Sequence, residues 1–182
     1  MPAVSPRLEQ SLRVGALMAL VIAITACRRT ADQPALEGPM SGWKIADRWS
    51  IGKGEQDGKP IFTRFNLGLK PLVGRPEFRQ QLGISVRLKD PTPDGLPTSA
   101  EAEQLSQIED EIVRRFVPGN ESLFAGVMTF NGMREYVLYT NDPKAASAKA
   151  TDLVRDIHHH ELQFAIHDDP SWANFKKFAA GA

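Results

Sequence analysis

The chain has 182 residues, with 22 basic and 22 acidic side chains, four histidines and a single cysteine. This length fits one domain of ordinary size plus a tail or targeting segment. With 42% apolar and 24% charged residues, the composition is that of a soluble globular core rather than a disordered chain. A formal net charge of zero removes the long-range attraction that a dedicated nucleic-acid binder needs. One cysteine excludes an internal disulfide and a four-thiolate zinc site.

The first 26 residues have the pattern of a bacterial lipoprotein signal peptide. Arg7 and Arg13 precede an apolar run over residues 14–24, which has the length of a signal-peptide core and is too short to span a bilayer. Residues 24–26 then lead into Cys27, and this segment resembles a lipobox. The resemblance implies cleavage before Cys27 and acylation of its thiol with chains such as palmitate, which would hold the protein on a membrane. A plain secretory signal and a short uncleaved anchor are the alternatives.

Residues 27–42 contain proline, glycine and charged residues without periodicity, which predicts a flexible tether between the lipid and a domain over residues 43–182. Arg28 stands where inner-membrane lipoproteins carry aspartate. The resemblance therefore implies the bacterial cell envelope, on the periplasmic side of the outer membrane.

Alternation of apolar and polar residues predicts six strands in the domain. They cover residues 43–51, 61–69, 82–88, 124–130, 134–140 and 161–167. Asp57-Gly58 provides hairpin-turn chemistry between the first two strands, and Asn131-Gly132 provides it between the fourth and fifth.

Three helices separate or follow these strands. Thr98 and Glu101 have the spacing of a capping box, and an apolar stripe then continues to Phe116 before Pro118-Gly119. Pro143 opens a second helix whose inner face ends near Ile157. A short C-terminal helix carries Trp172, Phe175 and Phe178. This aromatic stripe either meets a partner or packs over the sheet edge.

After the first hairpin, the order of elements is strand, helix, strand, strand, helix, strand. This βαββαβ order predicts an α+β fold of the ferredoxin-like type, an antiparallel sheet with two helices on one face. The first β-hairpin would extend the sheet or cover its edge, and the short C-terminal helix would follow.

Several short segments in this order resemble one bacterial family. They are Trp43, the DGKP sequence at 57–60 leading to Asn66, residues 95–97, 108–110 and 131–136, the DPSW sequence at 169–172, and Phe175 at an aromatic position. The chain is therefore similar to the domain of unknown function 695 over residues 43–178. The resemblance implies a fold like that of a cytoplasmic inhibitor of ribonuclease E, but it brings no catalytic residues with it, and fold similarity does not transfer activity.

The four histidines lie within ten residues, at 158–160 and 167. Neutral imidazoles bind zinc, copper or nickel, so His158, His160 and His167 are candidate metal ligands. Successive helical residues point about 100° apart, so the three adjacent histidines cannot all face one ion. The alternative is that they complement the dipole at a helix C-terminus.

Glu109, Asp110 and Glu111 lie in the middle of the first helix. Paired carboxylates can act as general acid and base, but neighbouring helical positions diverge. The apolar stripe places Glu109 near the buried face, where it would pair with Arg134 or Arg64 from the sheet.

The hairpin residues after Asn131-Gly132 are the most distinctive candidates for binding. Arg134 and Tyr136 share one face of the strand and Glu135 takes the other. An arginine and a tyrosine together bind a carboxylate or phosphate, or they tie the hairpin to its neighbours.

The sequence contains no glycine-rich phosphate loop, nucleophile elbow or other catalytic signature. We therefore expect a lipid-anchored envelope domain that binds a small ligand or an envelope protein without catalysis, a cofactor or nucleic acid. Its contact surface would be the open sheet face or the hairpin around Arg134 and Tyr136. The alternatives are a metal-assisted hydrolase using His158 to His160 and an intracellular regulator like the ribonuclease inhibitor.

Overall fold

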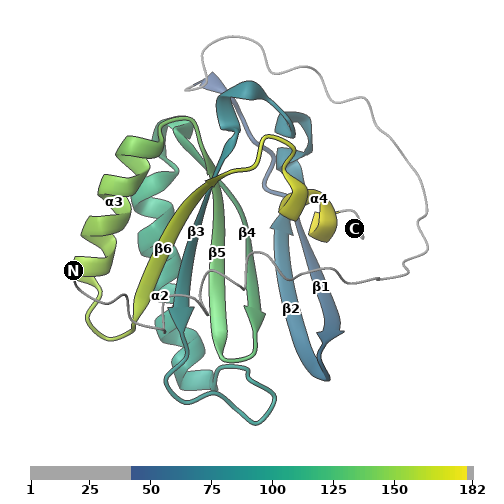
Figure 1. Ribbon diagram of the computed structural model, residues 1–182, viewed down its shortest axis with the longest axis vertical. Helices are drawn as coiled ribbons and strands as arrows, with labels where there is room; N and C mark the ends of the chain where they lie inside the picture. The colour runs from purple at the N-terminus through teal and green to yellow at the C-terminus, as the bar shows by residue number, and fades with distance from the viewer. Residues whose placement is uncertain (1–41, 180–182) are drawn as a thin grey trace, which may run out of the picture.

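The computed structural model describes residues 42–179, which form a mixed α+β domain around one antiparallel sheet (Figure 1). The strands are β1 (Trp49–Gln56), β2 (Lys59–Asn66), β3 (Gln80–Arg87), β4 (Ser122–Phe130), β5 (Met133–Thr140) and β6 (Leu162–Asp168). The helices are α2 (Ser99–Phe116), α3 (Pro143–Asp156) and α4 (Ala173–Ala179), with 3-10 helices η2 (Leu67–Leu72), η3 (Pro76–Phe78) and η4 (Pro118–Asn120). Cys27, the predicted signal peptide and the tether up to residue 41 lie outside the described residues.

The six strands lie in the order β1-β2-β4-β5-β3-β6, and every neighbouring pair is antiparallel. Both predicted hairpin turns are present. Asp57 and Gly58 have φ of 52° and 72°, and Asn131 and Gly132 have φ of 47° and 79°. Two consecutive positive φ values define the tight turn that suits the twist of a hairpin, so these local signals fix the β1–β2 and β4–β5 pairs.

The first two strands differ from their predicted bounds. Residues 43–48 form no strand, because Trp43 instead packs its ring against Phe78 and under the guanidinium of Arg75. At the other end, Asn66 caps η2 by accepting a hydrogen bond from the Gly68 backbone N–H. The chain therefore turns into a 3-10 helix where alternating leucines predicted more strand.

The helices α2 and α3 pack on one side of the sheet, which we call the helix face (Figure 1). Their apolar stripes supply Leu105, Ile108, Ile112, Phe116, Ala146, Ala150 and Leu153 to a core shared with the sheet. The cap of α2 forms as predicted on one side only. Thr98 Oγ1 accepts from the Glu101 N–H, whereas the Glu101 carboxylate turns away to the backbone N–H of Lys89, 2.6 Å distant. No helix within residues 42–179 has the length and apolar character of a membrane span.

The opposite side of the sheet, which we call the α4 face, is partly covered, so the expectation of an open face is wrong for that part. Trp43, η2 and α4 build a second core there with Phe65 and Tyr139. Trp172 and Phe175 are fully buried in it, and the Phe178 ring stacks on Phe65 at 5.4 Å between centroids. Packing of the aromatic stripe is therefore confirmed, over the face of the sheet near β2 rather than over its edge (Figure 1).

Candidate functional site

The three hairpin candidates are divided by the sheet, as their alternation predicts. Tyr136 lies on the helix face with no exposed surface, and its hydroxyl donates to the Leu105 carbonyl of α2 at 2.6 Å. Burial raises the pKa of the Tyr136 hydroxyl well above its usual value. Arg134, half-buried on the same face, donates from Nε to Thr129 Oγ1 at 3.0 Å. These contacts connect β5 to α2 and β4. The polar atoms of Tyr136 and Arg134 therefore stabilise the fold.

Glu135 lies on the α4 face and is different in kind. Its half-buried carboxylate makes no hydrogen bond or ion pair with any residue of the described chain. It lies over Gly83 of β3, so closely that a Cβ added to Gly83 would be 2.7 Å from Oε1. Burial raises the pKa of the Glu135 carboxyl, because a poorly hydrated site disfavours the charged form. The carboxylate thus lies close against β3 without a counter-charge from residues 42–179.

The residues around Glu135 lie on the α4 face beside the core that α4 builds, and Met128 packs against that core at the border. The register places Ser85 and Met128 directly opposite Glu135, and places Gln163 opposite Ser85, and directly opposed residues share a face. We call Ser85, Met128, Met133, Glu135, Gln163 and Ala165 the Glu135 surface. Gln163 and Ala165 are exposed and the other four are half-buried. Apart from Glu135, the set carries no charge.

The histidines do not converge. His160 is buried, with Nε2 3.2 Å from Glu101 Oε1, while His158 and His159 are exposed. His167 lies near the far end of β6 and is also exposed. Within residues 42–179, no three histidine, cysteine or acidic side chains are grouped as a metal site would require.

The contact between His160 and Glu101 joins the start of β6 to the first turn of α2. His160 Nδ1 and Glu101 Oε2 are both buried without a hydrogen-bond partner in the described chain. Burial lowers the pKa of His160, against the opposing effect of the hydrogen bond to Glu101. The neutral imidazole is therefore favoured, and it pairs with a carboxylate that also anchors Lys89.

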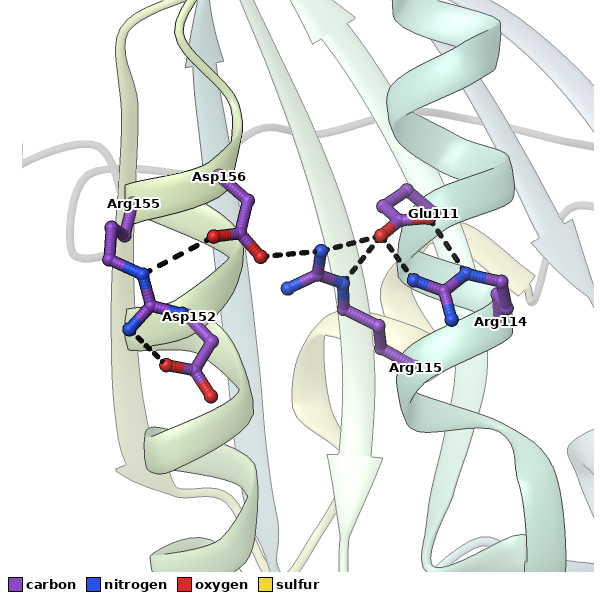
Figure 2. A network of polar contacts seen from close by, with 6 residues as sticks. All are labelled: Glu111, Arg114, Arg115, Asp152, Arg155 and Asp156. Carbon is purple, nitrogen blue, oxygen red and sulfur yellow. Dashed lines mark hydrogen bonds and ion pairs between the residues drawn. The ribbon is translucent and has the colours of Figure 1, made fainter.

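Two of the three helical carboxylates, Glu109 and Glu111, are engaged in ion pairs. Glu109 pairs with Arg64 of β2, which confirms one of its two expected partners, and the Arg64 guanidinium lies 4.7 Å from the centroid of the Trp49 ring. Figure 2 shows a second network, in which Glu111 accepts from Arg114 at 2.8 Å and from Arg115 at 2.7 Å.

This second network links the two helices of the helix face. Arg115 reaches across to Asp156 of α3 at 2.9 Å, and Arg155 joins Asp156 to Asp152 (Figure 2). The hydrogen bond from Arg114 is the largest effect lowering the pKa of Glu111, to about 2. A carboxylate held ionised in this way is a poor general acid, so the network braces α2 against α3.

Two hollows lie elsewhere on the described surface, and Glu135 lines neither. One, of about 500 Å³, is lined by Pro76, Glu77, Arg79, Gln80, Thr140, Asn141 and Pro143. The other, of about 320 Å³, lies between the start of the described chain, β1 and the end of α2, and includes Trp49, Val113 and Phe124. Sequence reasoning did not find these hollows, because each is assembled from segments far apart in the chain.

The segments at 57–60, 95–97 and 131–136 meet at one end of the sheet. Lys59 Nζ donates to Asn131 Oδ1 at 2.6 Å, and the Gly132 N–H donates to the Gly95 carbonyl at 2.8 Å. Gly95 has φ of 76°, and a Cβ there would lie 2.7 Å from the Asn131 Cα. A larger residue would therefore separate the loop from the hairpin.

The model of a protein family matches residues 47–179, nearly the whole described domain. The family is described as a family of unknown function, DUF695. The chain belongs to DUF695. No curated protein matches the chain.

In this DUF695 domain, the DPSW segment at 169–172 stabilises the fold. Asp169 accepts from the Tyr139 hydroxyl at 2.7 Å and from the Ala173 N–H at 2.9 Å, and Trp172 stacks on Tyr139 at 3.7 Å between centroids.

Proposed function

We propose that this DUF695 protein is a lipid-anchored protein of the bacterial cell envelope whose domain binds a partner through the Glu135 surface, without catalysis. The observation that carries the binding proposal is the Glu135 carboxylate, half-buried on the α4 face of the sheet with no partner in residues 42–179. Burial of a charge without a partner costs free energy. A positive charge supplied by a partner would offset the free-energy cost of the unpaired Glu135 carboxylate.

The other candidate residues support the same choice of surface. Tyr136 and Arg134 use their polar atoms within the fold, and Glu109 and Glu111 are paired with arginines. Among the acidic and hairpin residues singled out from the sequence, Glu135 thus combines partial burial with the lack of a partner. Hydrolysis with a metal on His158 and His160 is not favoured by any contact, since the two side chains do not share a site.

The envelope location is supported by the sequence pattern around Cys27. Arg7 and Arg13, the apolar run and the small residues before Cys27 are typical of a lipoprotein leader, and Arg28 favours the periplasmic side of the outer membrane. The acyl chains would hold the mature protein at the membrane, since each buried methylene contributes about 0.8 kcal/mol.

We also propose that β3 to β6 with α2 and α3 form a ferredoxin-like unit to which β1 and β2 are added. The sheet order β4-β5-β3-β6 and its uniformly antiparallel pairing support this. In such a unit, both helices cover one face and leave the other for additions or partners. Here α4 occupies one part of that second face and the Glu135 surface remains.

Two experiments test the proposal. Fatty-acid labelling and membrane fractionation of full-length protein beside Cys27→Ala should show acylation and membrane association in the wild type only. A photo-crosslinking amino acid at Ser85 in cells should give a discrete adduct, whereas the same group at Gln107, exposed on the outer side of α2, should not. Unlabelled, cytosolic wild-type protein would contradict the anchor. No adduct from Ser85, or equal adducts from both positions, would contradict the binding surface.

A further inference from the structure

The charge distribution around Glu135 is one-sided. Its neighbours on the Glu135 surface are a serine, two methionines, a glutamine and an alanine, none of which carries a positive charge. The nearest basic residue along β3 is Arg87, which is exposed and already paired with Glu161 at 3.2 Å. The residues directly opposite Glu135 therefore supply no counter-charge, and Arg87, which lies opposite Met133 on the same face, is engaged with Glu161.

An unneutralised, half-buried carboxylate selects for cations. A neutral or anionic group placed against it would bury the charge further without compensation, whereas an ammonium or guanidinium would supply the missing counter-charge and hydrogen-bond donors. The part of the desolvation cost already present in the free protein need not be met again on binding. Charge complementarity at this surface therefore points to a positively charged group.

The position of the Glu135 carboxylate above Gly83 indicates where a cationic group would bind. The carboxylate occupies the space above Gly83 that a side chain would otherwise fill, at 2.7 Å from the position of a Cβ. Any larger residue at position 83 would displace Glu135 from this seat. The acceptor oxygen therefore lies next to the sheet, above Gly83, and this is where a basic group would meet it.

The shape of the surface indicates the kind of molecule that carries the cation. Small-molecule sites are concave, whereas the neighbours of Glu135 lie side by side on adjacent strands of the sheet. A sheet surface of this kind suits a protein. Met128 and Met133 flank the carboxylate with flexible apolar side chains, and the methylene stem of a basic residue packs well on such groups.

Building on the proposed binding function, we propose that the Glu135 surface receives a lysine or arginine side chain from a partner protein. The basic head pairs with the Glu135 carboxylate above Gly83, and the aliphatic stem lies between Met128 and Met133. The inference adds the chemistry of the partner to the proposed site.

The methionines provide a direct assay. Full-length protein in neutral detergent, labelled with ¹³C at the methionine methyl groups, gives resonances for Met128 and Met133 beside the carboxylate. The probe is the peptide acetyl-Ser-Gly-Arg-Gly-Ser-amide at millimolar concentration, and its control is the same peptide with citrulline, which has nearly the shape of arginine without its charge. The arginine peptide should shift both resonances saturably, at an affinity at least ten-fold above that of the citrulline peptide.

Variants separate charge from fold. Glu135→Gln should abolish the difference between the two peptides, and Gly83→Ala should weaken binding of the arginine peptide while the charge is retained. Glu103→Gln, which removes an exposed carboxylate from α2, is the matched control and should bind as the wild type does. The methionine spectrum of each variant reports whether it is folded.

The outcomes separate the inference about a basic side chain from the proposed binding function of the Glu135 surface. Equal shifts with both peptides, or shifts that persist in Glu135→Gln, would overturn the basic-side-chain inference while leaving the Glu135 surface as a binding site. Absence of any shift, together with an adduct from Ser85 in cells, would also overturn the inference alone. Absence of both would overturn the inference and the proposed function together.

Discussion

Replacement of Trp172 by alanine tests whether the DPSW segment serves the fold. The Trp172 side chain has no exposed surface, its ring is parallel to that of Tyr139 within 2°, and Nε1 donates to the Phe78 carbonyl at 2.7 Å. It therefore fastens the start of α4 both to β5 and to η3. Nothing of the side chain remains for a partner to contact.

The expected loss follows from the buried area and the hydrogen bond. A buried tryptophan removes about 150–250 Å² from water, and at about 25 cal/mol per Å² this is worth about 4–6 kcal/mol. Replacement of large aromatic residues by alanine costs about 3–5 kcal/mol in practice, and the lost hydrogen bond adds about 1 kcal/mol. We expect Trp172→Ala to lower the free energy of unfolding by about 4–6 kcal/mol, a large part of the roughly 5–15 kcal/mol typical of a domain.

Two further variants divide this loss into its sources. Trp172→Phe keeps an aromatic ring over Tyr139 but cannot donate to the Phe78 carbonyl, so it should cost about 2 kcal/mol. Phe178→Ala removes a half-buried ring from α4, the helix that follows Trp172, and should cost about 1–2 kcal/mol. Urea unfolding followed by circular dichroism measures all three differences. A loss below about 1 kcal/mol for Trp172→Ala would refute the core assignment of α4.

Three other predictions concern the polar groups. Glu135→Gln should raise the free energy of unfolding by about 1 kcal/mol at pH 7, because it removes a half-buried unpaired charge. This gain should disappear near pH 4, where the wild-type carboxyl is protonated, and a loss of stability at pH 7 would contradict the prediction. Burial lowers the pKa of His160, so the unfolded chain binds the proton first and stability should fall as the pH drops below about 6.5. That slope, measured by urea unfolding between pH 8 and 5, should shrink in His160→Gln but not in His159→Gln. A double-mutant cycle on Arg64 and Glu109 should give a coupling below about 1 kcal/mol, as for other partly exposed pairs, and a value above 2 kcal/mol would show that the pair is more than a surface contact.

The local sequence signals predicted the elements that depend on local geometry. The turn residues Asp57-Gly58 and Asn131-Gly132 fixed both hairpins, since few residue pairs adopt two positive φ values at low cost. The apolar stripe of α2 likewise placed Glu109 near the sheet, where it meets Arg64. Such patterns specify the face on which a residue lies and limit its possible partners.

Elements that depend on distant partners were not predictable in the same way. The alternation around Trp43 is equally compatible with a strand and with an irregular segment held by Phe78. Glu101 has the spacing of a capping box, but its carboxylate binds the Lys89 backbone N–H and His160 Nε2 instead of the N-cap backbone. In both cases a tertiary contact overrides a local preference.

The candidate site shows the same limit. Alternation predicted that Glu135 lies on the other face of the sheet from Arg134 and Tyr136, and the strand register confirms this. The sequence could not show that Glu135 lacks a partner or that its carboxylate lies over Gly83, because both facts depend on which strand is paired with β5 and in which register. The signal that could have directed attention to this position is a glycine within a clearly alternating strand, since it marks a close approach from a neighbour.

The most direct measurement of the central claim is the titration of the Glu135 carboxyl in the free protein, followed by NMR of ¹³C-labelled glutamate and assigned with Glu135→Gln. If the carboxylate is half-buried and unneutralised on the sheet, its pKa lies above the usual value of about 4.3. A pKa at or below that value would show that the carboxylate is solvated or already paired, and the Glu135 surface would lose the reason for proposing it.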